Sequence, residues 1–256
     1  MSSRRETRSL PPSAGSTVGS TTTDHAGGFS SPTPGETATI LSVPTVLLAV
    51  HFLVQPLVDS WGRFGSVRYE AARAASPARI APEPLTGYAW WWHELTRLTH
   101  ALVHDPSGYH AHVVGNVVIL AGAAWALLAL LSALGRRRWF PFVYWELVVV
   151  APLVGSYAFD LWGQTPHGYG ASTIGYAFLG VVLVTGLFVL REHLPGAGRQ
   201  APTGSPLRPH FVAGLLAVVA CVVLVDLLSG SPATPVHQAG VGFGALVGSV
   251  VVHVDR

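Results

Sequence analysis

Two polar residues, each at the start of an apolar stretch, have the chemistry of a nucleophile and a base. Ser172 follows Gly170 and Ala171, and a hydroxyl in the first turn of a helix lies near unpaired backbone N–H groups and the positive end of the helix dipole. That environment favours a developing anion. His237 carries an imidazole, which activates a serine once it reaches the hydroxyl. Taken singly, each residue also fits an ordinary helix end.

Small residues after His237 predict that the two stretches pack closely. Gly240, Gly244 and Gly248 recur at intervals of four residues, which leaves one face of a helix without side chains. A neighbouring helix that begins at Ser172 would approach this face closely enough for the imidazole to reach the hydroxyl. The G-x-S-x-G pattern is missing around Ser172, which excludes the elbow of a soluble α/β-hydrolase.

A second polar group precedes the next apolar stretch. His112 and Asn116 lie four residues apart and share one helical face, so their two donor side chains project together. Three further histidines come before them: His100, His104 and His110. These imidazoles are metal ligands in one interpretation, and in the other they are bonded to backbone at a wet interface. The second is favoured because Asp105 is the only carboxylate nearby. We therefore expect no metal and no cofactor.

The composition is that of a membrane protein. Half of the 256 residues are hydrophobic and 11% are charged, whereas a soluble domain carries about 25% charged residues. The single cysteine, Cys221, cannot close an intrachain disulfide. The net charge is +2 and no basic patch is interleaved with aromatic residues, which argues against a nucleic-acid partner.

The apolar residues form six blocks, each long enough to cross a hydrocarbon core about 30 Å thick. They are Ala38 to Val58, Val113 to Leu134, Trp139 to Phe159, Ser172 to Leu190, His210 to Leu228 and Val236 to Val254. We therefore expect an all-α membrane protein, a bundle of six transmembrane helices over residues 37–256. Residues 1–36, rich in Ser, Thr, Pro and Gly, are expected to be a disordered tail. A large, partly embedded loop is expected over residues 59–92.

Six spans place both termini on one side of the membrane. The cluster Arg136, Arg137 and Arg138 lies between the second and third blocks, and short loops rich in arginine are typically cytoplasmic. The sequence therefore predicts a multi-pass protein of the cell membrane, with both termini in the cytoplasm.

Together and in this order, these features resemble the rhomboid family of intramembrane serine proteases, from roughly Trp92 to Gly248. Three segments carry the resemblance: T-H-A-L-V-H at 99–104 with H-V-V-G-N at 112–116, G-A-S-T-I-G-Y-A-F-L-G at 170–180, and H-Q-A-G-V-G-F-G at 237–244. They are similar to the family's H-x-x-x-N pair and to its patterns in the fourth and sixth spans.

The resemblance implies Ser172 as nucleophile and His237 as a base without a third, acidic member. It implies that Tyr176 packs beside the imidazole, and that His112 and Asn116 face the oxyanion together with the Ser172 N–H. The supporting glycines would be Gly170, Gly240 and Gly244. The implied substrates are transmembrane segments of other proteins in the lipid bilayer, cleaved without a cofactor.

The chain departs from the family pattern in three places. Thr173 replaces the second glycine of G-x-S-G and is expected to tighten the turn at the oxyanion hole and affect the rate. Arg97 stands one residue nearer His104 than in the family, with Thr96 in the usual tryptophan position, which predicts a rebuilt first loop. The second span lacks its usual late acidic residue, and Glu146 in the third span is expected to take part of that structural role through an arginine.

Two other functions are compatible with the sequence. An inactive rhomboid-like protein would bind membrane helices without cleaving them, although the presence of both Ser172 and His237 argues against it. A transporter of metal or small solutes would use the histidines. It would also be expected to carry paired acids within its spans and internal repeats, which the sequence lacks.

Overall fold

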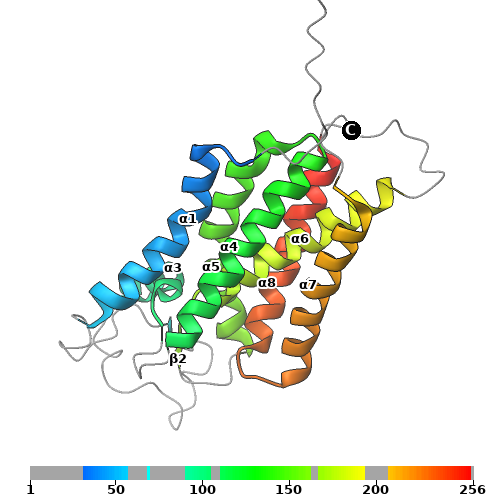
Figure 1. The fold of residues 1–256 in the computed structure, drawn as a ribbon. Coiled ribbons are helices and arrows are strands. Elements are labelled where there is room, and N and C mark those ends of the chain that lie inside the picture. The colour runs from blue at the N-terminus through cyan, green and yellow to red at the C-terminus, as the bar shows by residue number, and fades with distance from the viewer. Residues whose placement is uncertain are drawn as a thin grey trace, which may run out of the picture.

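The computed structural model describes residues 31–56, 68–69, 90–104, 110–162, 167–193 and 207–254. Six of its helices are long and apolar enough to cross a membrane, as the sequence predicts (Figure 1). They are α1 (Pro34–Ala49, extended by a π-helical turn, Val50–Val54), α4 (His110–Ala133), α5 (Phe140–Trp162, after a 3₁₀ turn, Arg137–Trp139), α6 (Ser172–Glu192), α7 (Pro209–Ser229) and α8 (Thr234–His253).

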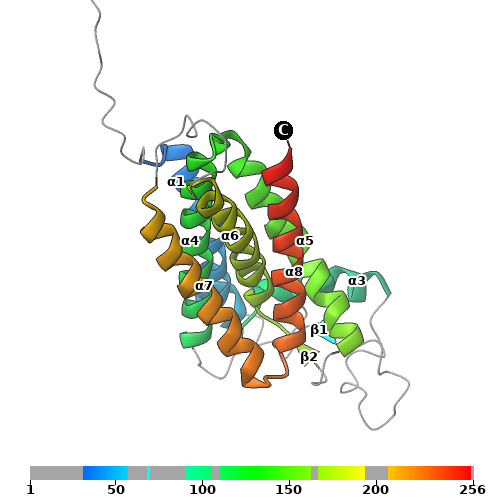
Figure 2. The same cartoon turned by 90° about the vertical axis from the view of Figure 1, so that its right-hand side faces the viewer.

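The central helix of the bundle is α6. It packs against α4, α5, α7 and α8, and the other helices surround it in both views (Figures 1 and 2). In its most apolar stretch 72% of the residues are buried, compared with 17% in α7. Anything at the first turn of α6 is therefore enclosed by neighbouring helices, whereas α7 lies at the edge of the bundle.

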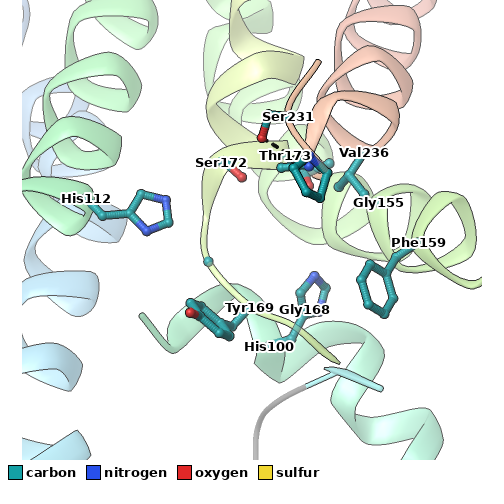
Figure 3. Close-up of a pocket in the computed structure, with 13 residues that line it drawn as sticks. His100, His112, Gly155, Phe159, Gly168, Tyr169, Ser172, Thr173, Ser231 and Val236 are labelled. Atoms are coloured by element: carbon teal, nitrogen blue, oxygen red, sulfur yellow. Dashed lines mark hydrogen bonds between the residues drawn. The ribbon is translucent and has the colours of Figure 1, made fainter. Parts of the chain in front are cut away.

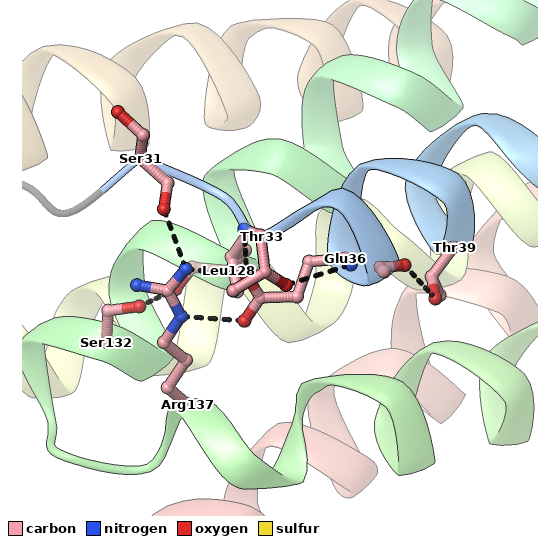
Figure 4. A network of polar contacts seen from close by, with 8 residues as sticks. Ser31, Thr33, Glu36, Thr39, Leu128, Ser132 and Arg137 are labelled. Carbon is pink, nitrogen blue, oxygen red and sulfur yellow. Dashed lines mark hydrogen bonds and ion pairs between the residues drawn. The ribbon is translucent and has the colours of Figure 1, made fainter.

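The start of α1 and the end of α8 lie at the same end of the bundle (Figure 1). The helix α1 begins at Pro34, inside the predicted tail, because Thr33 and Glu36 form a capping box; residues 1–30 lie outside the described part of the chain. Glu36 also accepts two hydrogen bonds from Arg137, at 2.5 and 2.6 Å (Figure 4). This ion pair fastens α1 to the α4–α5 connection.

Among the described residues, no arginine is the expected partner of Glu146. Glu146 makes no ion pair with any described residue, and it lines an apolar cavity between α5 and α8. In the α4–α5 connection, Arg137 pairs with Glu36 and Arg136 donates to the Val251 carbonyl of α8. The helix ends are thus tied together without the acid in the third span.

At the opposite end, short elements cover the bundle. The predicted loop over 59–92 falls mostly outside the described residues, apart from β1 (Arg68–Tyr69) and the start of α3 (Trp90–Thr99). The strand β1 pairs in antiparallel fashion with β2 (His167–Gly168), just before α6. A 3₁₀ turn, His100–Leu102, follows α3 and contacts α6.

An arginine fixes α3 to α5. The Arg97 guanidinium donates to Asp160 at 2.5 Å and to Ser156 at 3.1 Å, and it lies over the Tyr157 ring at 4.3 Å from the ring centroid. Glu94 of α3 binds the same guanidinium at 2.6 Å. The displaced arginine of the sequence pattern therefore anchors the segment that leads to the site.

Candidate active site

Ser172 is the first residue of α6 and lines a cavity of about 330 Å³ (Figure 3). The chain enters the helix through Gly170, which has φ +106°, a conformation that L side chains rarely adopt. Its N–H donates to the His100 carbonyl at 2.9 Å. A Cβ at this position would also lie 3.4 Å from the His112 ring. Gly170 thus sets both the direction of the serine turn and the space beside it.

His112 and Asn116, the two predicted oxyanion donors, differ in their surroundings. His112 projects from α4 and lines the same cavity as Ser172 (Figure 3). The buried Asn116 amide lies 3.0 Å from His104 Nε2 and does not line the cavity. A side-chain amide carries two N–H donors, and His104 engages one of the two in Asn116.

His237 lies in the first turn of α8, with its ring stacked on Tyr176. The two ring centroids are 4.2 Å apart and the planes differ by 5°. The helices approach closely because of glycine: a Cβ at Gly240 would lie 2.7 Å from the Thr173 carbonyl oxygen, and one at Gly244 would overlap the Ala177 carbonyl. The predicted seam between these helices is present, and Tyr176 is one helical turn beyond Ser172 on α6.

The serine hydroxyl and the imidazole face different cavities. His237 and Tyr176 line a second cavity of about 230 Å³, between α7 and α8, and Ser172 does not line it. No hydrogen bond joins Ser172 to His237, both of which belong to the described residues. The structure therefore places the two residues on adjoining helices but does not join them in one hydrogen bond.

An acidic residue that sequence reasoning missed is bound to the imidazole. Asp226, in the last turn of α7, has its Oδ1 2.7 Å from His237 Nδ1. The resemblance implies no acidic partner for the base, and here the structure differs. The available signal was a carboxylate inside an otherwise apolar span, where a charge is costly without a partner.

Four histidines before or at the start of α4 make hydrogen bonds to protein groups: His51, His100, His104 and His110. His100 Nδ1 lies 2.9 Å from the Thr96 carbonyl, which confirms the backbone-bonded interpretation for that residue. His51 Nε2 and His110 Nδ1 are 3.0 Å apart. Within the described residues, no group of three or more His, Cys, Asp or Glu side chains is arranged to hold a metal ion.

His104 is the most deeply buried of these imidazoles. The side chain of Gln55 holds its backbone at both N–H and carbonyl. Burial lowers the pKa of His104 to about 4, and the nearby rings of His112 and His51 add to the shift. A neutral His104 is thus part of the scaffold that holds Asn116.

Thr173 follows Ser172 in the first turn of α6, lines the same cavity and packs against α5. It is 2% exposed, and its Oγ1 lies 2.5 Å from the place where a Cβ on Gly155 would be. A glycine on α5 thus leaves the room that the threonine side chain occupies. The expected tightening of the oxyanion turn stays a prediction.

The chain matches no model of a known protein family, and no curated protein is similar to it. The resemblance to rhomboid proteases therefore remains a prediction from the sequence patterns.

Proposed function

We propose that this chain is an intramembrane serine protease of the rhomboid type, which cleaves transmembrane segments of membrane proteins through Ser172 and His237. The observation that carries the proposal is the α6–α8 seam. It stacks His237 on Tyr176, one turn from a serine that opens the central helix and lines a cavity. Neither a helix cap nor ordinary packing requires all three features at one place.

The proposed reaction is acyl transfer followed by hydrolysis. His237 Nε2 accepts the Ser172 proton while Oγ attacks the carbonyl carbon of the scissile bond. The oxyanion binds the Ser172 N–H at the positive end of α6 and the His112 imidazole, and a single such donor contributes about 3 kcal/mol. The imidazolium then protonates the leaving amine. A water molecule, deprotonated by His237, next attacks the acyl-enzyme ester, and the imidazolium returns the proton to Ser172 Oγ as the acid product leaves.

The hydroxyl and the imidazole have to meet for this reaction. Catalytic hydrogen bonds are often long before substrate binds and tighten in the complex. Ser172 is half-buried and its hydroxyl makes no hydrogen bond with another described residue, so rotation about its Cα–Cβ bond redirects Oγ without moving α6. Substrate in the cavity would favour the rotamer directed toward α8.

A second candidate function is an inactive rhomboid-like protein that binds membrane helices. One observation favours it, which is that Ser172 and His237 line separate cavities with no hydrogen bond between them. Under either function we place the protein in the cell membrane as a multi-pass protein. The arginines at 136–138 support an assignment of both termini to the cytoplasm.

The decisive experiment is cleavage of a single-span model substrate in liposomes. We expect Ser172→Ala and His237→Ala to lose cleavage. The matched controls Ser249→Ala and His253→Ala, which alter the same residue types at exposed positions further along α8, should retain it. Equal cleavage by the wild type and all four variants would contradict the protease function. Binding of the substrate without cleavage by the wild type would favour the inactive protein.

A further inference from the structure

Asp226 is a carboxylate inside a membrane helix, and its partners are at the proposed active site. Its side chain and that of His237 are each 13% exposed, with Oδ1 and Nδ1 2.7 Å apart. The carboxylate also interacts with the hydroxyl of Tyr176, the residue whose ring stacks on the imidazole. Because an ionised side chain is costly within a span, this placement requires compensation by its partners.

The end of α7 is built so that this carboxylate is held in place. The helix stops at Gly230, which has φ +62°, and a short turn leads directly into α8 (Figure 2). Two hydroxyls donate to the Asp226 backbone carbonyl, from Ser229 at 2.7 Å and Thr234 at 3.2 Å. Asp226 and His237 are thus fixed on the two sides of one turn, eleven residues apart.

We propose that Asp226 is a positioning residue for His237, which makes the site a serine–histidine–aspartate triad. This inference rests on the proposed function. Asp226 accepts a hydrogen bond from the Nδ1–H of His237, which keeps the proton on Nδ1 and leaves the lone pair on Nε2, the nitrogen that takes the Ser172 proton. During acyl transfer the proton moves from Oγ to Nε2 and later to the leaving amine, while Nδ1 keeps its proton and Asp226 stays ionised.

Other titratable groups around His237 do not supply this contact. The helix α6 contributes Tyr176, whose ring covers one face of the imidazole, and Ser172 one turn earlier. On α5, Glu146 lies beside Phe243 and Val250 of α8, well beyond the first turn. The other acid of α5, Asp160, is bound to Arg97.

The test is the pH dependence of cleavage in Asp226→Asn. We expect kcat to fall on the order of 10²–10⁴-fold with little change in KM, because the amide can stabilise the wrong tautomer and carries no charge. We also expect the acidic limb of kcat/KM to move to lower pH, since the imidazolium loses its counter-ion. Asp226→Glu should regain much of the activity, and Glu146→Gln, the matched acid of another span, should keep the wild-type profile.

A purely structural link between α7 and α8 would give a different result. If Asp226→Asn lowers the unfolding temperature but keeps the acidic limb and kcat, the positioning role is overturned and the protease function stands. Cleavage that survives Ser172→Ala overturns both. If Asp226→Asn does not fold, the tautomer of His237 can still be measured in the wild type. The ¹⁵N chemical shifts of the neutral His237 ring should show the proton on Nδ1. A proton on Nε2 would contradict the positioning role.

Discussion

Substitution of Gly244 by alanine tests whether the close approach of α6 and α8 holds the site together. The added Cβ would overlap the Ala177 carbonyl oxygen and lie 2.7 Å from the carbonyl carbon and 3.0 Å from Cα. These atoms belong to the backbone of the central helix, so a change of side-chain rotamer cannot relieve the overlap. The two helices have to move apart.

The expected cost follows from this geometry. Overpacking of a core that can adjust its side chains costs about 1–3 kcal/mol. Because backbone must yield here, we expect Gly244→Ala to lose about 3 kcal/mol or more of unfolding free energy. A displacement of about 1 Å between catalytic groups costs on the order of 10²-fold in rate. Any folded fraction should therefore also cleave at least that much more slowly, since His237 moves with α8.

The matched control is Gly242→Ala on the same helix. A Cβ there meets nothing within 4 Å, and alanine favours a helix by about 1 kcal/mol over glycine. This variant should be as stable as the wild type or slightly more so. Thermal unfolding in detergent micelles and cleavage in liposomes measure the two effects. Equal stability and activity of the two variants would refute the close seam.

Three further predictions concern the surroundings of the site. Gly155→Ala should lose about 1–3 kcal/mol of unfolding free energy, because the new methyl group meets Thr173. In thermal unfolding, the double variant with Thr173→Gly should regain stability. The pKa of His104 falls from 6.5 to about 4 on folding, so its contribution to the unfolding free energy should be constant above pH 6.5 and should drop by about 3 kcal/mol as pH falls from 6.5 to 4. Denaturant titrations of His104→Gln should lack this pH dependence. Arg97→Ala removes the guanidinium that pairs with Asp160, where both side chains are 10% exposed, and should lower the unfolding free energy by about 3 kcal/mol in chemical unfolding. Adding Asp160→Asn should recover part of that stability, and no recovery would contradict the ion pair.

The membrane helices could be predicted from the sequence because a hydrocarbon core requires about twenty apolar residues in a row. The predicted block from His210 to Leu228 corresponds to α7, Pro209–Ser229, to within one residue at each end. The start of α1 was harder to place, because its limit is set by hydrogen bonds between Thr33 and Glu36 and not by hydropathy.

The site was only partly predictable. Spacing on one helix indicated that Tyr176 follows Ser172 by one turn, and the glycines indicated a close neighbour for α6. Contacts between helices depend on the angle and distance at which the helices cross, and the sequence alone does not give these. The fit of Thr173 against Gly155 is one example, and the bond from Asp226 to His237 is another.

The central claim is that Ser172 is a nucleophile activated by His237. The most direct measurement is labelling of the intact protein in liposomes with a fluorophosphonate, which reacts with activated serines, and location of the adduct by peptide mass spectrometry. The adduct should be on Ser172, and its rate of formation should fall on the order of 10²-fold or more in His237→Ala. An unlabelled Ser172, or a rate unchanged by His237→Ala, would contradict the account.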